Sequence, residues 1–168
     1  MAYTDQFRAT DDYIAHTNAL VKDIDDPFIR QRYIGFITIS AVTAYELAIK
    51  DILIEFARRK HNVFGAYIES VYERINGKIS IKDLKKNHVP KFGAKYAKRF
   101  ERHLDKYEKE HLTRFRRSIK SSYGNIITWR NVFVHEGNLA GNASYDEAVS
   151  AYEDGKQLIH VVARTMVR

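Results

Sequence analysis

Hydrophobic residues recur along this chain at the three- and four-residue intervals of an α-helix. The chain has 2 prolines and 8 glycines, and no stretch sustains the alternation of apolar and polar residues that a half-buried strand needs. These patterns predict an all-α protein. Because its 168 residues show neither an internal repeat nor a linker, we expect a single domain over residues 1–168, large enough to bury a core.

The longest predicted helix lies at the centre of a bundle. Asp26 suits an N-cap and Pro27 a first helical position, while the basic residues 58–60 suit a helix C-terminus. Between these ends, residues 34–42 are apolar on nearly every side, as in a helix that neighbours cover. The sequence therefore predicts a helical bundle with a long central helix over residues 27–60 and additional short helices.

The other predicted helices are bounded by caps, breaks and loops. Ser80 begins a capping-box pattern that opens a brief helix, and Ser144 begins a second capping box. Residues 87–90 are a predicted break, residues 121–124 a possible bend, and residues 138–142 a predicted loop. Besides the central helix, the predicted helices cover roughly residues 4–24, 64–75, 93–112, 113–136 and 145–166.

Charge is distributed unevenly along the chain. The formal net charge is +7, and residues 91–120 alone hold 11 Lys or Arg against 4 Asp or Glu, so the rest of the chain is neutral. A focused positive field attracts polyanions, and interleaved aromatic rings could stack bases. The alternative is a solvated helix face with Glu–Lys pairs and core aromatics. The candidate polyanion-binding cations are Lys95, Lys98, Arg99, Arg102, Arg114, Arg116, Arg117 and Lys120.

Several classes of function are disfavoured by what the sequence lacks. Without cysteine there can be no disulfide, thiolate zinc site or cysteine nucleophile. The N-terminus shows no secretory signal pattern, and the least charged stretch, residues 33–49, is too short and polar for a membrane span. The histidines lack metal-site spacing. We therefore expect a cytoplasmic protein with no metal, no cofactor and no membrane contact.

The candidate chemistry lies near the end of the helix predicted over residues 113–136. Asn131 and His135 are four residues apart, so they share one face of that helix, and Arg130 adds a permanent cation. A histidine at a helix C-terminus can act as a general base and acid, although it can also serve only as a cap. An amide, a cation and a proton-transfer group together suit chemistry on a phosphodiester.

Arg130 also falls on the apolar face of its helix, in line with Ile126 and Phe133. A charge in that position needs a partner, and Glu46 is the only charged residue between Tyr33 and Ile49 on the central helix. Two interpretations stay open. Either Arg130 and Glu46 form a buried structural ion pair, or Glu46 orients Arg130 at the edge of a cleft that faces an anion.

Residues 130–137, Arg-Asn-Val-Phe-Val-His-Glu-Gly, resemble the Arg-x(4–6)-His motif of the HEPN superfamily (higher eukaryotes and prokaryotes nucleotide-binding domains). Residues 44–53 resemble its central helix with an acidic residue, and residues 144–148 open a helix after the motif, as in many members. The resemblance spans nearly the whole chain and is closest to the RiboL-PSP-HEPN-like branch. Glu136 departs from the pattern, in which glycine often follows the histidine directly.

This resemblance implies a metal-independent endoribonuclease that forms a two-fold dimer, with both motif copies in one cleft. Many members are toxins of toxin–antitoxin or anti-phage modules, held inactive by a partner protein. By this hypothesis His135 deprotonates a ribose 2′-hydroxyl, Arg130 stabilises the phosphate, Asn131 orients it, and Glu46 fixes Arg130. The eight candidate cations of the basic segment, residues 91–120, would bind the RNA backbone. The RNA product then carries a 2′,3′-cyclic phosphate. The alternative is a catalytically inert HEPN module that binds RNA, a nucleotide or a partner protein.

Overall fold

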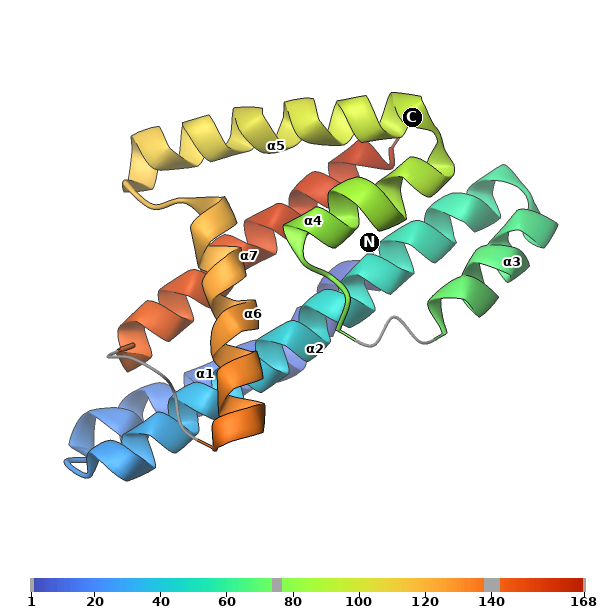
Figure 1. Cartoon of the computed structure of the whole chain (residues 1–168). Helices are drawn as coiled ribbons and strands as arrows, with labels where there is room; N and C mark the ends of the chain where they lie inside the picture. The colour runs from blue at the N-terminus through green and yellow to red at the C-terminus, as the bar shows by residue number, and fades with distance from the viewer. Residues whose placement is uncertain (1, 74–76, 138–142, 168) are drawn as a thin grey trace.

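The structure is a computed structural model that describes residues 2–73, 77–137 and 143–167. Every regular element within these ranges is helical, which confirms the predicted all-α class (Figure 1). The predicted loop at residues 138–142 lies outside the described residues, as do residues 74–76. In chain order the elements are η1 (Ala2–Phe7), α1 (Arg8–Leu20), η2 (Val21–Asp23), α2 (Pro27–Lys60), α3 (Asn62–Tyr72), α4 (Ile81–Asp83), η3 (Leu84–His88), η4 (Val89–Phe92), α5 (Ala94–Phe115), α6 (Ile119–Glu136) and α7 (Tyr145–Thr165).

The long central helix is confirmed as α2, with the predicted ends. The Asp26 carboxylate accepts hydrogen bonds from the backbone N–H groups of Phe28 at 2.8 Å and Ile29 at 3.4 Å, and Pro27 occupies the first turn. Helices α1, α3, α6 and α7 all pack against α2, so most of its length is covered (Figure 1). None of the helices in the described ranges has the length and apolar content needed to span a bilayer.

The connection between α5 and α6 differs from the prediction. The α5 helix continues to Phe115, and a turn through Arg116, with a left-handed φ of 58°, separates it from α6. The predicted bend at residues 121–124 is wrong, because α6 is regular from Ile119 to Glu136. Ser118 caps α6 by accepting the N–H of Ser121 at 3.0 Å. The two helices therefore leave a sharp corner in different directions (Figure 1).

The predicted break at residues 87–90 is also wrong. Instead of stopping, the chain passes from a π-helical turn over Leu84–His88 into a 3-10 turn over Val89–Phe92. His88 is buried there, with Nδ1 3.1 Å from the Tyr72 hydroxyl and Nε2 2.7 Å from the Lys78 carbonyl oxygen. Helical geometry ends only at Gly93, whose φ of 111° favours glycine.

Helix α6 is held on α2 by contacts at two levels. The Tyr123 ring stacks on Tyr45 of α2, with ring centroids 5.2 Å apart. Nearer its C-terminus, Phe133 lies against Gly35, where an added Cβ would be 2.3 Å from the ring. Residues 35 and 45 of α2 thus meet residues 133 and 123 of α6, so the two helices run in opposite directions. The Phe133–Gly35 contact places the last turns of α6 beside the N-terminal half of α2.

Candidate functional site

The Arg130–His135 motif forms the last two turns of α6 and is open to solvent. Arg130 is half-buried, and its Nη1 donates a hydrogen bond to the Asn131 Oδ1 at 3.0 Å. Asn131 and His135 are exposed. The helix ends at Gly137, whose left-handed φ of 71° is the conformation usual for a glycine that follows a helix. Arg130 and Asn131 are therefore in contact, and Asn131 and His135 share one face of α6, while the role of the three side chains as one site stays a prediction.

A further cation lies beside the motif. Arg32 of α2 donates from Nη1 to the Gly137 carbonyl oxygen at 2.8 Å, so it binds the carbonyl end of the motif helix. Its guanidinium carbon is also 4.4 Å from the Phe28 ring centroid and 5.8 Å from that of Phe133. The sequence analysis missed Arg32, because nothing local to residues 27–60 indicates which helix end lies above it.

The predicted link between Glu46 and Arg130 is wrong. Glu46 accepts the backbone N–H of Gly77 at 3.0 Å and lies 3.7 Å from Lys50 Nζ. Its neighbour Tyr45 stacks on Tyr123, seven residues and about 10 Å along α6 from Arg130. Glu46 therefore lies two turns away from the motif, and within the described residues Arg130 has no carboxylate partner. The structural ion pair and the Glu46-oriented arginine are both ruled out.

The α6 face that holds Asn131 and His135 is uncovered over most of its length. Thr128 on the same stripe is exposed, and a Cβ added to Gly124 would meet no atom within 4 Å. A single protomer thus offers the motif as a convex helix face. A general base, an amide and a cation on such a face can act on a phosphodiester only if something else closes the site from the other side.

The eight predicted polyanion-binding cations have different environments. Arg117 and Lys120 are engaged by carboxylates of the fold, since Lys120 Nζ lies 2.7 Å from Asp105 Oδ1 and Arg117 binds Asp154. Arg99 donates to the Val167 carbonyl oxygen. The remaining five are exposed at the surface: Lys95, Lys98, Arg102, Arg114 and Arg116. The structure therefore separates cations that hold the fold from cations that face solvent.

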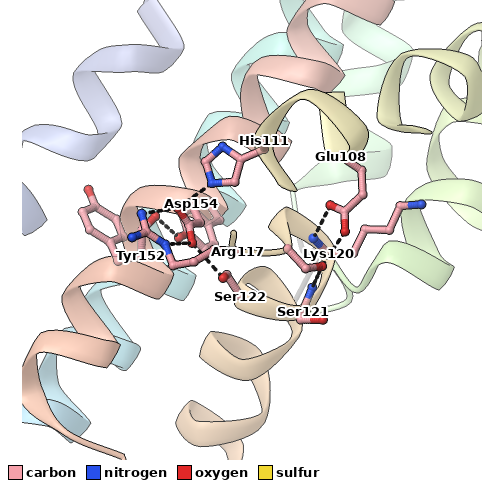
Figure 2. Close-up of polar contacts among 10 residues, drawn as sticks. Glu108, His111, Arg117, Lys120, Ser121, Ser122, Tyr152 and Asp154 are labelled. Atoms are coloured by element: carbon pink, nitrogen blue, oxygen red, sulfur yellow. Dashed lines mark hydrogen bonds and ion pairs between the residues drawn. The ribbon is translucent and has the colours of Figure 1, made fainter. Parts of the chain in front are cut away.

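A buried carboxylate network, absent from the sequence analysis, occupies the corner between α5 and α6 (Figure 2). Asp154 of α7 is 2% exposed. It lies 2.8 Å from His111 Nε2 and accepts hydrogen bonds from Arg117 Nε at 2.8 Å and Ser122 Oγ at 2.9 Å. Burial acts to raise the pKa of Asp154, but the hydrogen bonds from Arg117, Ser122 and His111 outweigh it and hold the pKa below its usual range.

Two signals in the sequence point toward this network. Asp154 lies three residues after Ala151 and four before Leu158, so it falls on an apolar face of the last helix, and a carboxylate on such a face needs partners. Arg117 lies in the segment of excess positive charge. Their pairing joins α5, α6 and α7, so this arginine contributes to the corner of the fold.

The aromatic residues of the basic segment belong mostly to the core. Phe100 is fully buried, and Tyr96 and Tyr107 pack against the core while partly exposed. Phe115 is the exception at 44% exposed. Within the described residues, no group of three or more His, Asp or Glu side chains is arranged to hold a metal ion.

A comparison with protein families agrees with this all-α fold. The sequence profile of the RiboL-PSP-HEPN family matches residues 5–167. Comparison with curated proteins and comparison with solved structures each give no match. Because the match covers nearly the whole chain, including α2 and the motif at the end of α6, the chain belongs to the RiboL-PSP-HEPN family.

Proposed function

We propose that this chain is a metal-independent endoribonuclease whose reacting groups are Arg130, Asn131 and His135. One observation carries the proposal: Arg130 is hydrogen-bonded to Asn131 near the exposed end of α6, and the described residues give Arg130 no ion pair that would explain its presence structurally. His135 lies one turn beyond Asn131 on the same helix face. Membership of a HEPN family supports the same reading, because HEPN domains are often ribonucleases.

The chemistry follows from the three groups. His135 removes the proton from a ribose 2′-hydroxyl, and the 2′-oxygen attacks the adjacent phosphorus. Arg130 binds the phosphate oxygens and stabilises the negative charge that develops on them. Asn131 donates its amide N–H to the phosphate or ribose while its Oδ1 holds Arg130. As the bond to the 5′-oxygen breaks, a protonated histidine gives that oxygen its proton, which leaves a 2′,3′-cyclic phosphate and a 5′-hydroxyl.

We infer from the open motif face that the working unit is a dimer. Large apolar side chains are exposed on the neighbouring turns, with Val134 of α6 49% exposed and Phe28 of α2 57% exposed. A second copy docked there by a two-fold axis would cover these side chains and place its own Arg130 and His135 opposite the first pair. The second histidine then supplies the proton to the leaving oxygen.

The same chemistry suits a toxin of a toxin–antitoxin or anti-phage module. An uncontrolled ribonuclease of this kind damages the RNA of its own cell, so an antitoxin protein that covers the motif face would be required. We place the protein in the cytoplasm, where RNA is the available substrate. The whole chain, residues 1–168, acts as one HEPN domain in this proposal.

The test is incubation of the purified protein with a mixed-sequence RNA, with and without EDTA. We expect cleavage in both conditions and products ending in a 2′,3′-cyclic phosphate. His135→Ala and Arg130→Ala should each lower the rate at least about 100-fold, the scale of a lost general base or lost charge stabilisation. DNA of the same sequence should remain intact because it lacks the 2′-hydroxyl.

Glu46→Gln is the matched control. Its amide oxygen can still accept the Gly77 N–H, and Glu46 lies away from the motif, so we expect wild-type cleavage and a stability change below about 1 kcal/mol. Cleavage that disappears in EDTA and returns with Mg²⁺ contradicts the metal-free scheme. A pure, folded dimer that binds RNA but never cleaves it supports the inert module instead.

A further inference from the structure

Two adjoining hollows lie along α5, beside the C-terminal end of α7. The first is lined by basic residues only: Lys95, Lys98, Arg99 and Arg102. The second is lined by residues of both helices: Arg102, His103, Lys106, Tyr107 and Arg164. Arg102 borders both, so we treat them as one surface, the α5–α7 groove. Six of its lining residues are Lys or Arg, and none is Asp or Glu.

The groove is a regular feature of the helix surface. Its α5 cations recur at three- and four-residue intervals from Lys95 to Lys106, which places them on one face over about 16 Å. The α7 side is held by two contacts. The Arg164 guanidinium carbon is 5.3 Å from the Tyr107 ring centroid, and Arg99 donates to the Val167 carbonyl oxygen. The positive charges are therefore positioned by two helices that pack together.

Within the described residues, few acidic side chains pair with the cations of this groove. Lys106 lies 3.8 Å from Glu110, whereas the nearby Glu101 is directed to Lys85 at 3.9 Å. His103 lines the groove, and the nearby positive charges affect its pKa. Its pKa is lowered by burial and then by the charges of the surrounding cations, which are Arg99, Arg102, Lys106 and Arg164. Its buried Nδ1 has no hydrogen-bond partner among the described residues.

We propose that the α5–α7 groove binds the phosphodiester backbone of RNA at a site separate from the Arg130–His135 motif. A stacked strand rises ~3.4 Å per nucleotide along its axis, so the ~16 Å row of cations spans the length of about five nucleotides. The groove's exposed groups are cations, which contact phosphates and carry little sequence information. The inference rests on the proposed function in taking RNA as the polyanion.

The separation from the motif follows from the corner between α5 and α6. At ~1.5 Å per residue, Arg102 lies about 20 Å before the end of α5, and Arg130 lies about 16 Å beyond the start of α6. The two helices diverge from that corner (Figure 1). The groove would thus hold a part of the RNA several nucleotides away from the bond that is cut.

Binding of a 20-nucleotide RNA tests the proposal, with all variants built on His135→Ala so that no substrate is cut. The groove variant combines Arg102→Gln, Lys106→Gln and Arg164→Gln. We expect it to lose at least about 10-fold in affinity near 0.1 M salt, and the slope of log K against log salt to fall by about 2, since each lost phosphate contact changes it by ~0.7. Fluorescence anisotropy measures both.

The matched control removes three exposed cations elsewhere: Lys22→Gln, Lys82→Gln and Lys86→Gln. It changes the net charge equally, so we expect less than about a 3-fold loss. Equal losses in the two triple variants would overturn the proposal, because they would show a general charge effect. Thermal unfolding checks that both triple variants are folded.

The His103 ring gives a second, local readout. A bound phosphate beside it offsets the surrounding positive charge, so the pKa of His103 should rise when the RNA is added. NMR titration follows the ring signals, assigned with His103→Gln. Single-stranded DNA of equal length should produce the same rise without being a substrate. If RNA binds but the pKa of His103 does not change, the RNA binds outside the groove and the proposal is wrong. If the wild-type protein binds RNA in the groove but does not cleave it, the proposed role of the Arg130–His135 motif is wrong and the groove proposal still holds.

Discussion

Asp154 shows how one buried charge can organise a region of the fold. Its two carboxylate oxygens form hydrogen bonds with the side chains of Arg117, Ser122 and His111, which belong to three different segments. Arg117 also binds through Nη2, at 3.0 Å from Oδ1, so the arginine is bidentate. Because a buried carboxylate is costly unless its hydrogen-bonding capacity is used, this network stabilises only the arrangement in which all partners meet.

Asp154→Asn should destabilise the protein in a pH-dependent way. At neutral pH we expect a loss of about 1–3 kcal/mol, because the amide cannot accept from all of the donors. The folded-state pKa of Asp154 lies below its unfolded value, so its stabilisation is complete above about pH 4 and is lost as the pH falls through the folded-state value. The gap between wild type and variant should therefore narrow below about pH 4.

Urea unfolding at several pH values measures that gap. Asp12→Asn is the control, because Asp12 is exposed on α1, and it should change stability by less than about 0.5 kcal/mol. A gap that widens as the pH falls would mean that the carboxyl of Asp154 is protonated in the folded protein at neutral pH.

At the scale of elements, sequence reasoning succeeded where the determining contacts are local. The caps at Asp26, Ser80 and Ser144 bond to groups two or three residues away, so α2, α4 and α7 begin where predicted. The corner between α5 and α6 was missed for the opposite reason. Arg116 adopts a left-handed conformation that its residue type does not signal, and Glu108 accepts the N–H of Lys120 from twelve residues away.

The candidate site divides in the same way. The contact between Arg130 and Asn131 and the shared helix face of Asn131 and His135 follow from helical spacing alone, so both could be predicted from the sequence. The partner of Arg130 depends on the position of α6 along α2. The packing of Phe133 against Gly35 fixes that position. The sequences of residues 44–53 and 126–133 do not by themselves show which residues of α2 and α6 are in contact. The predicted pairing of Arg130 with Glu46 was therefore wrong.

The packing of α7 on α2 gives the second prediction. An added Cβ on Gly155 would be 2.1 Å from the Tyr45 hydroxyl, which donates to the Tyr152 carbonyl oxygen at 2.7 Å. Tyr45 is fully buried between the stacked rings of Tyr123 and Tyr152, so it has no room to move. Gly155→Ala should lower the free energy of unfolding by about 2–4 kcal/mol through overpacking and a lost buried hydrogen bond.

Gly124→Ala is the matched control for this variant. Both glycines lie inside helices, but a Cβ at position 124 meets no atom within 4 Å. Alanine favours a helix over glycine, so this variant should gain up to about 1 kcal/mol. Chemical denaturation of the two variants at equal protein concentration decides the matter. A loss in both would mean that close packing at Gly155 is not the cause.

For the whole molecule, the distribution of charge distinguishes two surfaces, the basic α5–α7 groove and the surface around the Arg130–His135 motif. The groove is lined mainly by α5, and the Arg130–His135 motif belongs to the last turns of α6. Figure 1 shows α5 along the top of the molecule and α6 running away from it toward the bottom. Near the motif the added features are Arg32 and exposed apolar side chains such as Phe28 and Val134. A surface of this composition suits docking of a second protein chain better than wrapping of a long polyanion.

A mixing experiment tests whether that second chain is another copy of this protein. In a site shared across a two-fold axis, an Arg130→Ala protomer still offers His135, and a His135→Ala protomer still offers Arg130. About half of randomly mixed dimers combine the two, and each of these holds one His135 and one Arg130 from different protomers but no second histidine to protonate the leaving oxygen. A 1:1 mixture should therefore cleave faster than either variant alone and recover less than about a quarter of wild-type cleavage. Arg130 and His135 acting within one protomer would leave the mixture as inactive as its parts, because neither chain then has both groups.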